Sequence, residues 1–187
     1  MDLTNTQHRW GGVQQTLHWF IVIAAITQLT LGFTFTSLPQ DDPVRGTVFA
    51  AHATVGLIIL AVMLARLGWR LSNPVPRLPE TLKPWEKRLA RSTHWLLYLL
   101  LIGMPIGGYL LVNAHGHAVP FFGTELPPLI PANETLEEII EVIHIGGAFS
   151  IIGLVILHAV GALRHEFILH DNTLRRMTPL SDKWPNP

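Results

Sequence analysis

Four long apolar runs divide the chain, and a polar segment separates each run from the next. The runs cover residues 17–38, 47–71, 92–112 and 139–163. Each is long enough to cross the hydrocarbon core of a bilayer, which takes about 20 residues of α-helix. Backbone polar groups in lipid must be satisfied within their own segment. The pattern therefore predicts an all-α, integral membrane four-helix bundle.

The connecting segments are rich in turn residues and charges. Residues 40–43 form a short acidic turn, residues 72–91 hold four prolines and many bases, and residues 113–138 make the longest loop. Asn133 is expected to cap the fourth helix, with acids following it at the positive end of the helix dipole. Pro105 is expected to kink the third helix. We expect no cleaved signal peptide and one transmembrane domain over residues 1–187.

The composition agrees with a membrane protein and excludes several kinds of chemistry. Mean hydropathy is +0.34 and 14% of the residues are charged, against about 25% in soluble proteins. The net charge of zero leaves no basic field for nucleic acid. The chain has no cysteine, which excludes disulfides, thiolate-bound iron–sulfur clusters and covalent c-type heme. It has ten histidines, and this surplus needs a reason.

Basic residues are distributed unevenly among the connecting segments. Of the 13 lysines and arginines, only Arg45 lies in the two segments that follow the first and third runs. The positive-inside rule therefore predicts that both termini are cytoplasmic. Trp19, Trp69 and Trp95 lie at the predicted cytoplasmic ends of their helices, and interfacial indoles are enriched at such positions. The two outer loops carry acids instead, at Asp41, Asp42, Glu125, Glu134, Glu137, Glu138 and Glu141.

With this topology, four histidines fall at two depths. His18 opens an outward-going helix, so it lies on the cytoplasmic side, whereas His52 and His144 open inward-going helices on the outer side. His158 follows His144 by 14 residues, which is about 21 Å along a helix and within about 40° of the same face. The prediction is one pair outside, His52 with His144, and one pair inside, His18 with His158.

Two facing imidazoles at one level of an apolar bundle form a bis-histidine heme b site. Small residues would let a porphyrin approach a helix closely, and they occur here as Gly56, Gly146, Gly147, Gly153 and Gly161. A single intramembrane histidine could instead serve packing or hydrogen bonding. Zinc is a weaker alternative because it prefers about four ligands at one place. A proton relay would need acids within the spans, which contain none apart from Glu141 at the outer edge of the fourth run.

Other residues are secondary candidates. His94 rivals His18 or His158 as an inner ligand, or it bonds a propionate or a quinone. Arg45 outside and Arg9, Arg66 and Arg164 inside could pair with propionates, although positive-inside bias explains most of them. We interpret the remaining histidines as loop, tail or surface residues; they are His8, His115, His117, His165 and His170.

Several short motifs surround these histidines, and another lies in the tail. They are Leu17–Trp19, Ala51–Gly56, Arg66–Arg70 with Pro74 and Pro76, His94 with Tyr98, His144, Gly153–Ala159 and Asp171–Met177. In this combination the sequence resembles the bacterial cytochrome b561 family, the four-helix diheme b cytochromes of the inner membrane. The resemblance implies two hemes b, held by His18 with His158 on the cytoplasmic side and by His52 with His144 on the periplasmic side.

The resemblance also implies electron transfer within the inner membrane, with ubiquinone as one partner and an unidentified periplasmic donor or acceptor. One branch of the family is similar to a superoxide oxidase, which passes electrons from superoxide to ubiquinone. Two features depart from the family pattern. His165-Glu166 stands where relatives often have two histidines, and the acidic outer loops do not favour an anionic substrate. A heme-bearing anchor subunit of a hydrogenase- or dehydrogenase-type complex is a further alternative.

Overall fold

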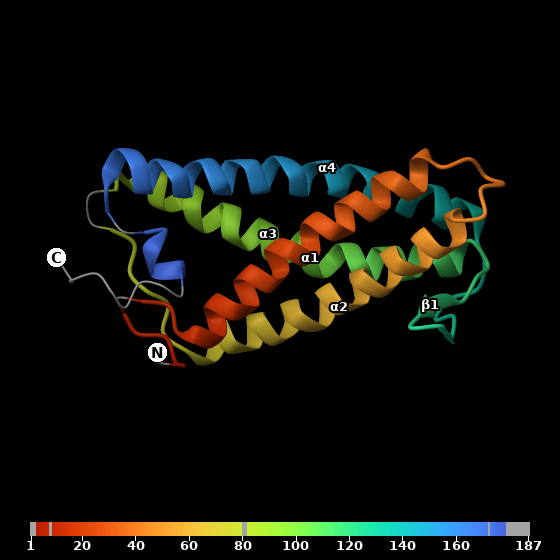
Figure 1. Ribbon diagram of the computed structural model, residues 1–187, viewed down its shortest axis with the longest axis horizontal. Helices are drawn as coiled ribbons and strands as arrows, with labels where there is room; N and C mark the ends of the chain where they lie inside the picture. Colours follow the sequence, from red (N-terminus) through yellow and green to blue (C-terminus); the bar gives the residue numbers. More distant parts are fainter. Residues whose placement is uncertain (1–2, 8, 80–81, 172, 179–187) are drawn as a thin grey trace.

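Four long α-helices dominate the computed structural model, which describes residues 3–7, 9–79, 82–171 and 173–178. The helices are α1 (Gly12–Ser37), α2 (Arg45–Ser72), α3 (Pro84–Ala114) and α4 (Glu134–Arg164) (Figure 1). All four are long and apolar enough to cross a membrane. The prediction of an all-α four-helix membrane bundle is confirmed.

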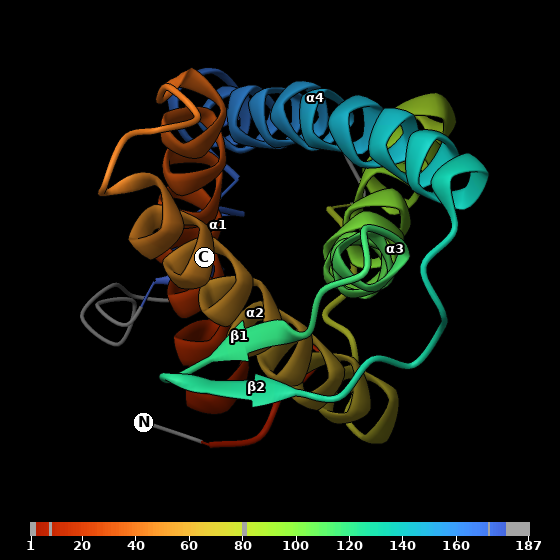
Figure 2. The ribbon, with the colours of Figure 1, turned by 90° about the vertical axis from the view of Figure 1, so that its right-hand side faces the viewer.

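The four helices follow one another around the bundle. α1 packs against α2, α2 against α3, and α3 against α4, and Figure 2 shows this arrangement along the long axis. We call the end that holds the start of α1 and the end of α4 the tail end (Figure 1). The opposite end carries a small β-hairpin beside α2, and we call it the hairpin end.

Apolar side chains face both the inside and the outside of the bundle. Ile21, Ala24, Ile59, Met63 and Tyr98 form the buried core between α1, α2 and α3. Many large apolar side chains point outward instead, with Ile23 at 67%, Leu99 at 66% and Val142 at 72% exposure. A helix that is apolar on all sides is expected in lipid, where outward-facing side chains meet acyl chains rather than water.

The helices extend beyond the predicted apolar runs. α3 begins at Pro84, within the polar connection and ahead of the predicted span that starts near Ser92. The cause is local: proline suits the first helical position, and the backbone N–H of Lys83 donates to the Glu86 carboxylate at 2.8 Å. α3 continues as a helix through Pro105.

The longest predicted loop contains the hairpin. Strands β1 (Val119–Phe121) and β2 (Thr124–Leu126) pair antiparallel, with Val119 opposite Leu126. Phe122 and Gly123 turn the chain with positive φ angles of 48° and 78°. After the loop, the Asn133 side chain accepts a hydrogen bond from the backbone N–H of Leu136 at 2.9 Å, which confirms the predicted cap of α4.

Candidate functional site

Both ends of α4 carry a histidine whose ring faces a histidine of another helix. At the hairpin end, the ring centroids of His52 on α2 and His144 on α4 are 6.3 Å apart, with an interplanar angle of 69°. At the tail end, the centroids of His18 on α1 and His158 on α4 are 6.1 Å apart, at 78°. The structure thus brings together both pairs that the depth argument predicted.

These separations suit a metal ion between the two rings. Two metal–imidazole bonds of about 2.0–2.1 Å span about 4 Å, and one ring radius at each end brings the centroids to about 6 Å apart. Among the described residues, no group of three or more His, Cys, Asp or Glu side chains could hold a metal ion. Paired imidazoles without further protein ligands match iron in a macrocycle that supplies the other four nitrogens.

At the hairpin end, Gln28 on α1 contacts both ring nitrogens of His52. The Nδ1 of His52 lies 3.2 Å from the backbone oxygen of Gln28. A carbonyl can only accept, so Nδ1 carries the proton and Nε2 keeps its lone pair, which is the form that binds a metal. The side-chain Nε2 of Gln28 lies 3.1 Å from His52 Nε2 and can donate to that lone pair.

An apolar cavity of about 480 Å³ lies beside this pair, and His52 and His144 both line it. Glycines bring the helix backbones close to the rings. A Cβ at Gly32 would stand 3.1 Å from His52 Cε1, and one at Gly108 would stand 3.1 Å from His144 Cε1. The Nδ1 of His144 is buried without a hydrogen-bond partner in the described structure. The volume and the lining of this cavity suit a large apolar group.

The tail-end pair lies in a group of hydrogen-bond donors. Arg66 NH2 on α2 donates to His18 Nδ1 at 3.0 Å, and its guanidinium lies over the Tyr98 ring at 5.4 Å. The Nε of Arg66, the indole N–H of Trp69 and the hydroxyl of Tyr98 are buried without hydrogen-bond partners in the described structure. Buried donors of this kind require acceptors. A heme propionate would supply such acceptors together with the negative charge that the guanidinium needs.

A third imidazole lies at the tail end. The ring of His94 on α3 is centred 5.2 Å from that of His158. That separation is shorter than the roughly 6 Å that a bridging metal ion needs, whereas the His18–His158 separation matches it. The ring spacing therefore favours the predicted pair, His18 with His158, over a pair that includes His94.

The secondary arginines have different surroundings. Arg45 NH1 donates to the backbone oxygens of Phe35 and Leu38 at 2.7 and 2.6 Å, so this guanidinium closes the end of α1. Arg164 pairs with Glu86 at 3.1 Å. Arg9 lies in a turn before α1, where its backbone N–H bonds to Thr6 Oγ1.

Two of the remaining histidines, His115 and His165, bond to carboxylates. His115 Nδ1 is 2.5 Å from Glu137 Oε1 in the hairpin-end loop, and the His117 ring is centred 5.3 Å from the His115 ring. His165 bonds to Asp171 beyond α4. His8 lies outside the described residues.

Sequence reasoning named Arg66 as a possible propionate partner but missed Gln28 and the buried donors Tyr98 and Trp69. A signal for Gln28 was present, because it is a polar residue in the middle of an uncharged run. The donor role of Tyr98 and Trp69 had no such signal, because aromatic residues at these positions also fit an interfacial helix end.

A four-helix membrane bundle with facing imidazoles at both ends defines a class, the b-type membrane cytochromes. Comparison with known proteins identifies the family. The profile of prokaryotic cytochrome b561 matches residues 9–180, and the chain belongs to this family. It is therefore a multi-pass membrane protein of electron transfer that binds b-type heme.

Named relatives match nearly the whole chain. Cytochrome b561 homolog 2 of Escherichia coli strain K12 is 30% identical over 178 residues, which cover 95% of each chain. The probable superoxide oxidase CybB of Yersinia pestis is 34% identical over 176 residues, covering 91% of this chain and 96% of its own. Cytochrome b562 of Cereibacter sphaeroides is 30% identical over 169 residues, covering 88% of this chain and 92% of its own.

Proposed function

We propose that this chain is a diheme b-type cytochrome that transfers electrons within the bacterial inner membrane and exchanges them with ubiquinone. One heme lies between His52 and His144 at the hairpin end, and the other between His18 and His158 at the tail end. The observation that carries the proposal is the presence of two histidine pairs with centroid separations of 6.3 and 6.1 Å. Both pairs share α4.

Bound heme would supply one-electron chemistry at iron in a low-dielectric shell. The protein's part is to hold and orient. Gln28 sets the tautomer of His52 through its backbone oxygen, Gly32 and Gly108 keep the ring surroundings open, and Arg66 provides positive charge beside His18. The mostly apolar wall of the hairpin-end cavity gives the pair a low-dielectric environment.

The proposal includes an orientation. In the sequence, twelve of the 13 lysines and arginines lie before the first run, in or beside the segment between the second and third runs, or after the fourth run, which favours the cytoplasmic side for both termini. The hairpin end then faces the periplasm. Ubiquinone is proposed because the family resemblance implies it, and the donors around His94 and Tyr98 offer hydrogen bonds to an oxygen-bearing head group near the tail end.

Heme content tests the proposal. Purified protein should contain two hemes per chain in a pyridine hemochrome assay, and redox titration of the α band should resolve two potentials. His52→Ala and His18→Ala should each retain one heme, with different remaining potentials. A wild-type content of one heme or none, or the same remaining potential in both variants, would contradict the diheme assignment.

The name of the Yersinia pestis relative favours a second candidate, superoxide:ubiquinone oxidoreductase. In that reaction two superoxide ions become two O₂, and ubiquinone takes up the two electrons with two protons. The hairpin end does not attract anions, because its acids outnumber its one base and Arg45 already bonds to two carbonyls at the end of α1.

Stopped-flow mixing with superoxide tests this candidate. If superoxide is the substrate, heme reduction should greatly exceed that of an unrelated b cytochrome. It should also accelerate with ionic strength, because salt screens like-charge repulsion. A rate of heme reduction equal to that of the unrelated cytochrome would exclude superoxide as the substrate and would leave the proposed electron transfer as the function.

A further inference from the structure

The tail after α4 carries the motif Asp171–Met177, to which the proposed function assigns no role. This tail folds back onto the bundle. One π-helical turn, His165–Leu169, continues α4, and His170 then reverses the chain with a positive φ of 50°. A short 3₁₀ turn, Arg175–Met177, follows. We call residues 165–171 with 173–178 the tail segment.

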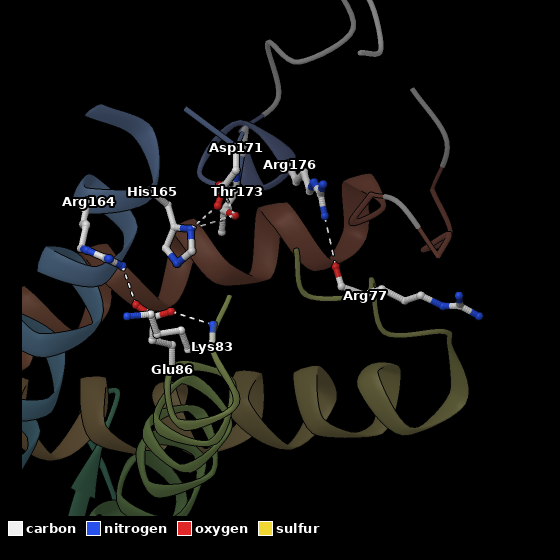
Figure 3. A network of polar contacts seen from close by, with 8 residues as sticks. All are labelled: Arg77, Lys83, Glu86, Arg164, His165, Asp171, Thr173 and Arg176. Carbon is white, nitrogen blue, oxygen red and sulfur yellow. Dashed lines mark hydrogen bonds and ion pairs between the residues drawn. The ribbon is translucent and has the colours of Figure 1, made fainter. Parts of the chain in front are cut away.

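Asp171 holds the tail segment in its folded-back form. Its Oδ2 accepts from His165 Nδ1 at 2.5 Å, and its Oδ1 accepts from the backbone N–H and the hydroxyl of Thr173 at 3.1 and 2.6 Å (Figure 3). A second link joins Arg175 to Glu166, with both nitrogens at 2.7 Å from Glu166 Oε1. The side chains of His165 and Asp171 are only 15% and 12% exposed, so these charge-assisted bonds are shielded from water.

The far part of the tail segment is bonded to α1. The indole N–H of Trp19 donates to the backbone oxygen of Met177 at 2.8 Å, and Gln15 Nε2 donates to that of Arg176 at 3.2 Å. Gln15 is almost completely buried, at 1% exposure. Arg176 also bonds to the backbone oxygen of Arg77 in the connection between α2 and α3 (Figure 3).

These anchors lie on the helical turn that carries a proposed heme ligand. Gln15 and Trp19 flank His18, and the Trp19 ring is centred 5.4 Å from the His18 ring. The partner of His18 is His158, which lies on α4 ahead of the tail segment. The tail segment therefore links the two helices whose histidines face each other at the tail end.

A covalent continuation of α4 is needed here because α1 diverges from α4 at this end. Figure 1 shows α1 starting beside the end of α2 and approaching α4 further toward the hairpin end. Phe33 of α1 and Phe149 in the middle of α4 are 6.0 Å apart. At the tail end, the tail segment lies between the end of α4 and the start of α1. It fills the position that helix packing occupies elsewhere in the bundle.

We propose that the tail segment is a positioning strap, which ties the end of α4 to the His18 turn of α1 and so sets the geometry of the His18–His158 pair. Asp171 and Trp19 are the positioning residues. Asp171 holds the strap in its folded-back form, and the Trp19 indole hydrogen-bonds to its far part. The effect on heme rests on the proposed function, whereas the effect on helix separation does not.

The helix separation is tested without reference to heme. The chain has no cysteine, so Thr16→Cys with Leu163→Cys introduces a unique spin-label pair at exposed positions of α1 and α4. In the full-length protein, Asp171→Asn and Trp19→Phe should broaden and lengthen the distance distribution between the labels. Asp41→Asn and Trp85→Phe are matched controls at exposed sites and should leave it unchanged. Distributions identical to wild type in both test variants would overturn the proposal.

The heme readout uses the second site as an internal control. Asp171→Asn and Trp19→Phe should shift the midpoint potential and the low-spin EPR signal of the tail-end heme and leave the hairpin-end heme unchanged. Asp171→Glu, which keeps the carboxylate, should restore part of the wild-type signal. Equal shifts at both hemes would overturn the positioning role. A wild-type protein with fewer than two hemes would refute the diheme function, and the label distances would still decide the strap.

Discussion

Individual residues surround the two histidine pairs with different hydrogen-bond chemistry. His52 donates from Nδ1 to a backbone oxygen, which leaves the lone pair on Nε2. A metal would take that lone pair in place of the hydrogen bond from Gln28 Nε2. His18 instead receives a hydrogen bond at Nδ1 from a guanidinium, so its proton lies on Nε2. For His18 to bind iron through Nε2, Arg66 must give its hydrogen bond to another acceptor. This requirement is a further argument that Arg66 pairs with a propionate.

Removal of the Arg66 charge tests that argument. Arg66→Met keeps an unbranched apolar stem and loses a charge-assisted hydrogen bond of about 1.5–3 kcal/mol. Heme affinity at the tail end should fall roughly tenfold or more, while the hairpin-end heme is retained. Spectral titration with hemin measures both. Arg88→Met, at an exposed position of the same end, is the matched control. Equal affinities in the two variants would exclude the propionate role.

Gly108 provides a second residue-scale test. A Cβ there would stand 3.1 Å from His144 Cε1, whereas a Cβ at Gly107 would meet nothing within 4 Å. Gly108→Ala should therefore displace the His144 ring and lower the occupancy of the hairpin-end heme, and Gly107→Ala should not. Pyridine hemochrome content and the EPR signals of the two hemes are the measurements. Equal loss in both variants would show that helix propensity rather than ring contact decides the outcome.

α4 is the element that both sites share, and its sequence supports its length at each end. Asn133 caps its start, Glu134 and Glu137 lie in its first turn, and Arg164 lies in its last turn. Acids near the N-terminus and bases near the C-terminus of a helix are stabilising. These signals were readable in advance because they involve only neighbours in the chain.

The cap of α4 gives an element-scale prediction. Asn133→Ala removes the acceptor for the Leu136 N–H and should lower the free energy of unfolding by roughly 0.5–2 kcal/mol. Asn133→Asp retains an acceptor and should stay close to wild type. Thermal unfolding in detergent, followed by helical circular dichroism, compares the three proteins. An unchanged midpoint for Asn133→Ala would show that loop contacts hold this end instead.

The hairpin in the longest loop escaped prediction for a physical reason. Each strand has three residues, which is too short to show an alternation of apolar and polar positions. Its turn uses Phe122 with a positive φ, whereas two-residue turns are usually recognised by Asn-Gly or Asp-Gly. The start of α3 at Pro84 was missed because charged residues fill its first turns, although the proline and Glu86 are a helix-start signal.

The attachment of the tail segment to the bundle is expected to depend on pH. Burial alone would raise the pKa of Asp171, but hydrogen bonds from Thr173 and His165 outweigh it and hold this pKa below its ordinary value of 3.8. A lowered carboxyl pKa contributes stability above the ordinary value, and that stability is lost as the pH falls through the lowered value. The tail segment should therefore stay attached at pH values above 3.8 and detach only in stronger acid.

A spin label on Leu174→Cys measures this attachment as label mobility. Mobility should stay low and constant above the ordinary aspartate pKa and rise only below it. In Asp171→Asn the label should be mobile at every pH, which separates Asp171 from the neighbouring acid Glu166. A rise in mobility near neutral pH would point to another group.

Orientation in the membrane is also a property of the whole molecule. The proposed topology places Asp41 in the periplasm and Arg88 in the cytoplasm. In intact cells, a membrane-impermeant maleimide should label Asp41→Cys, and it should label Arg88→Cys only after lysis. The opposite pattern would reverse the assignment of the two heme sites to membrane sides.

The sequence by itself determined the number of helices, their membrane character and the two levels of paired histidines. These follow from run length, from charge asymmetry and from the 14-residue spacing of His144 and His158 on one helix, all of which are local quantities. Only the tertiary structure decided which groups surround each pair. Gln28 reaches His52, Arg66 reaches His18, and Met177 reaches Trp19. Contacts between distant segments depend on how helices cross and diverge, which no local pattern specifies.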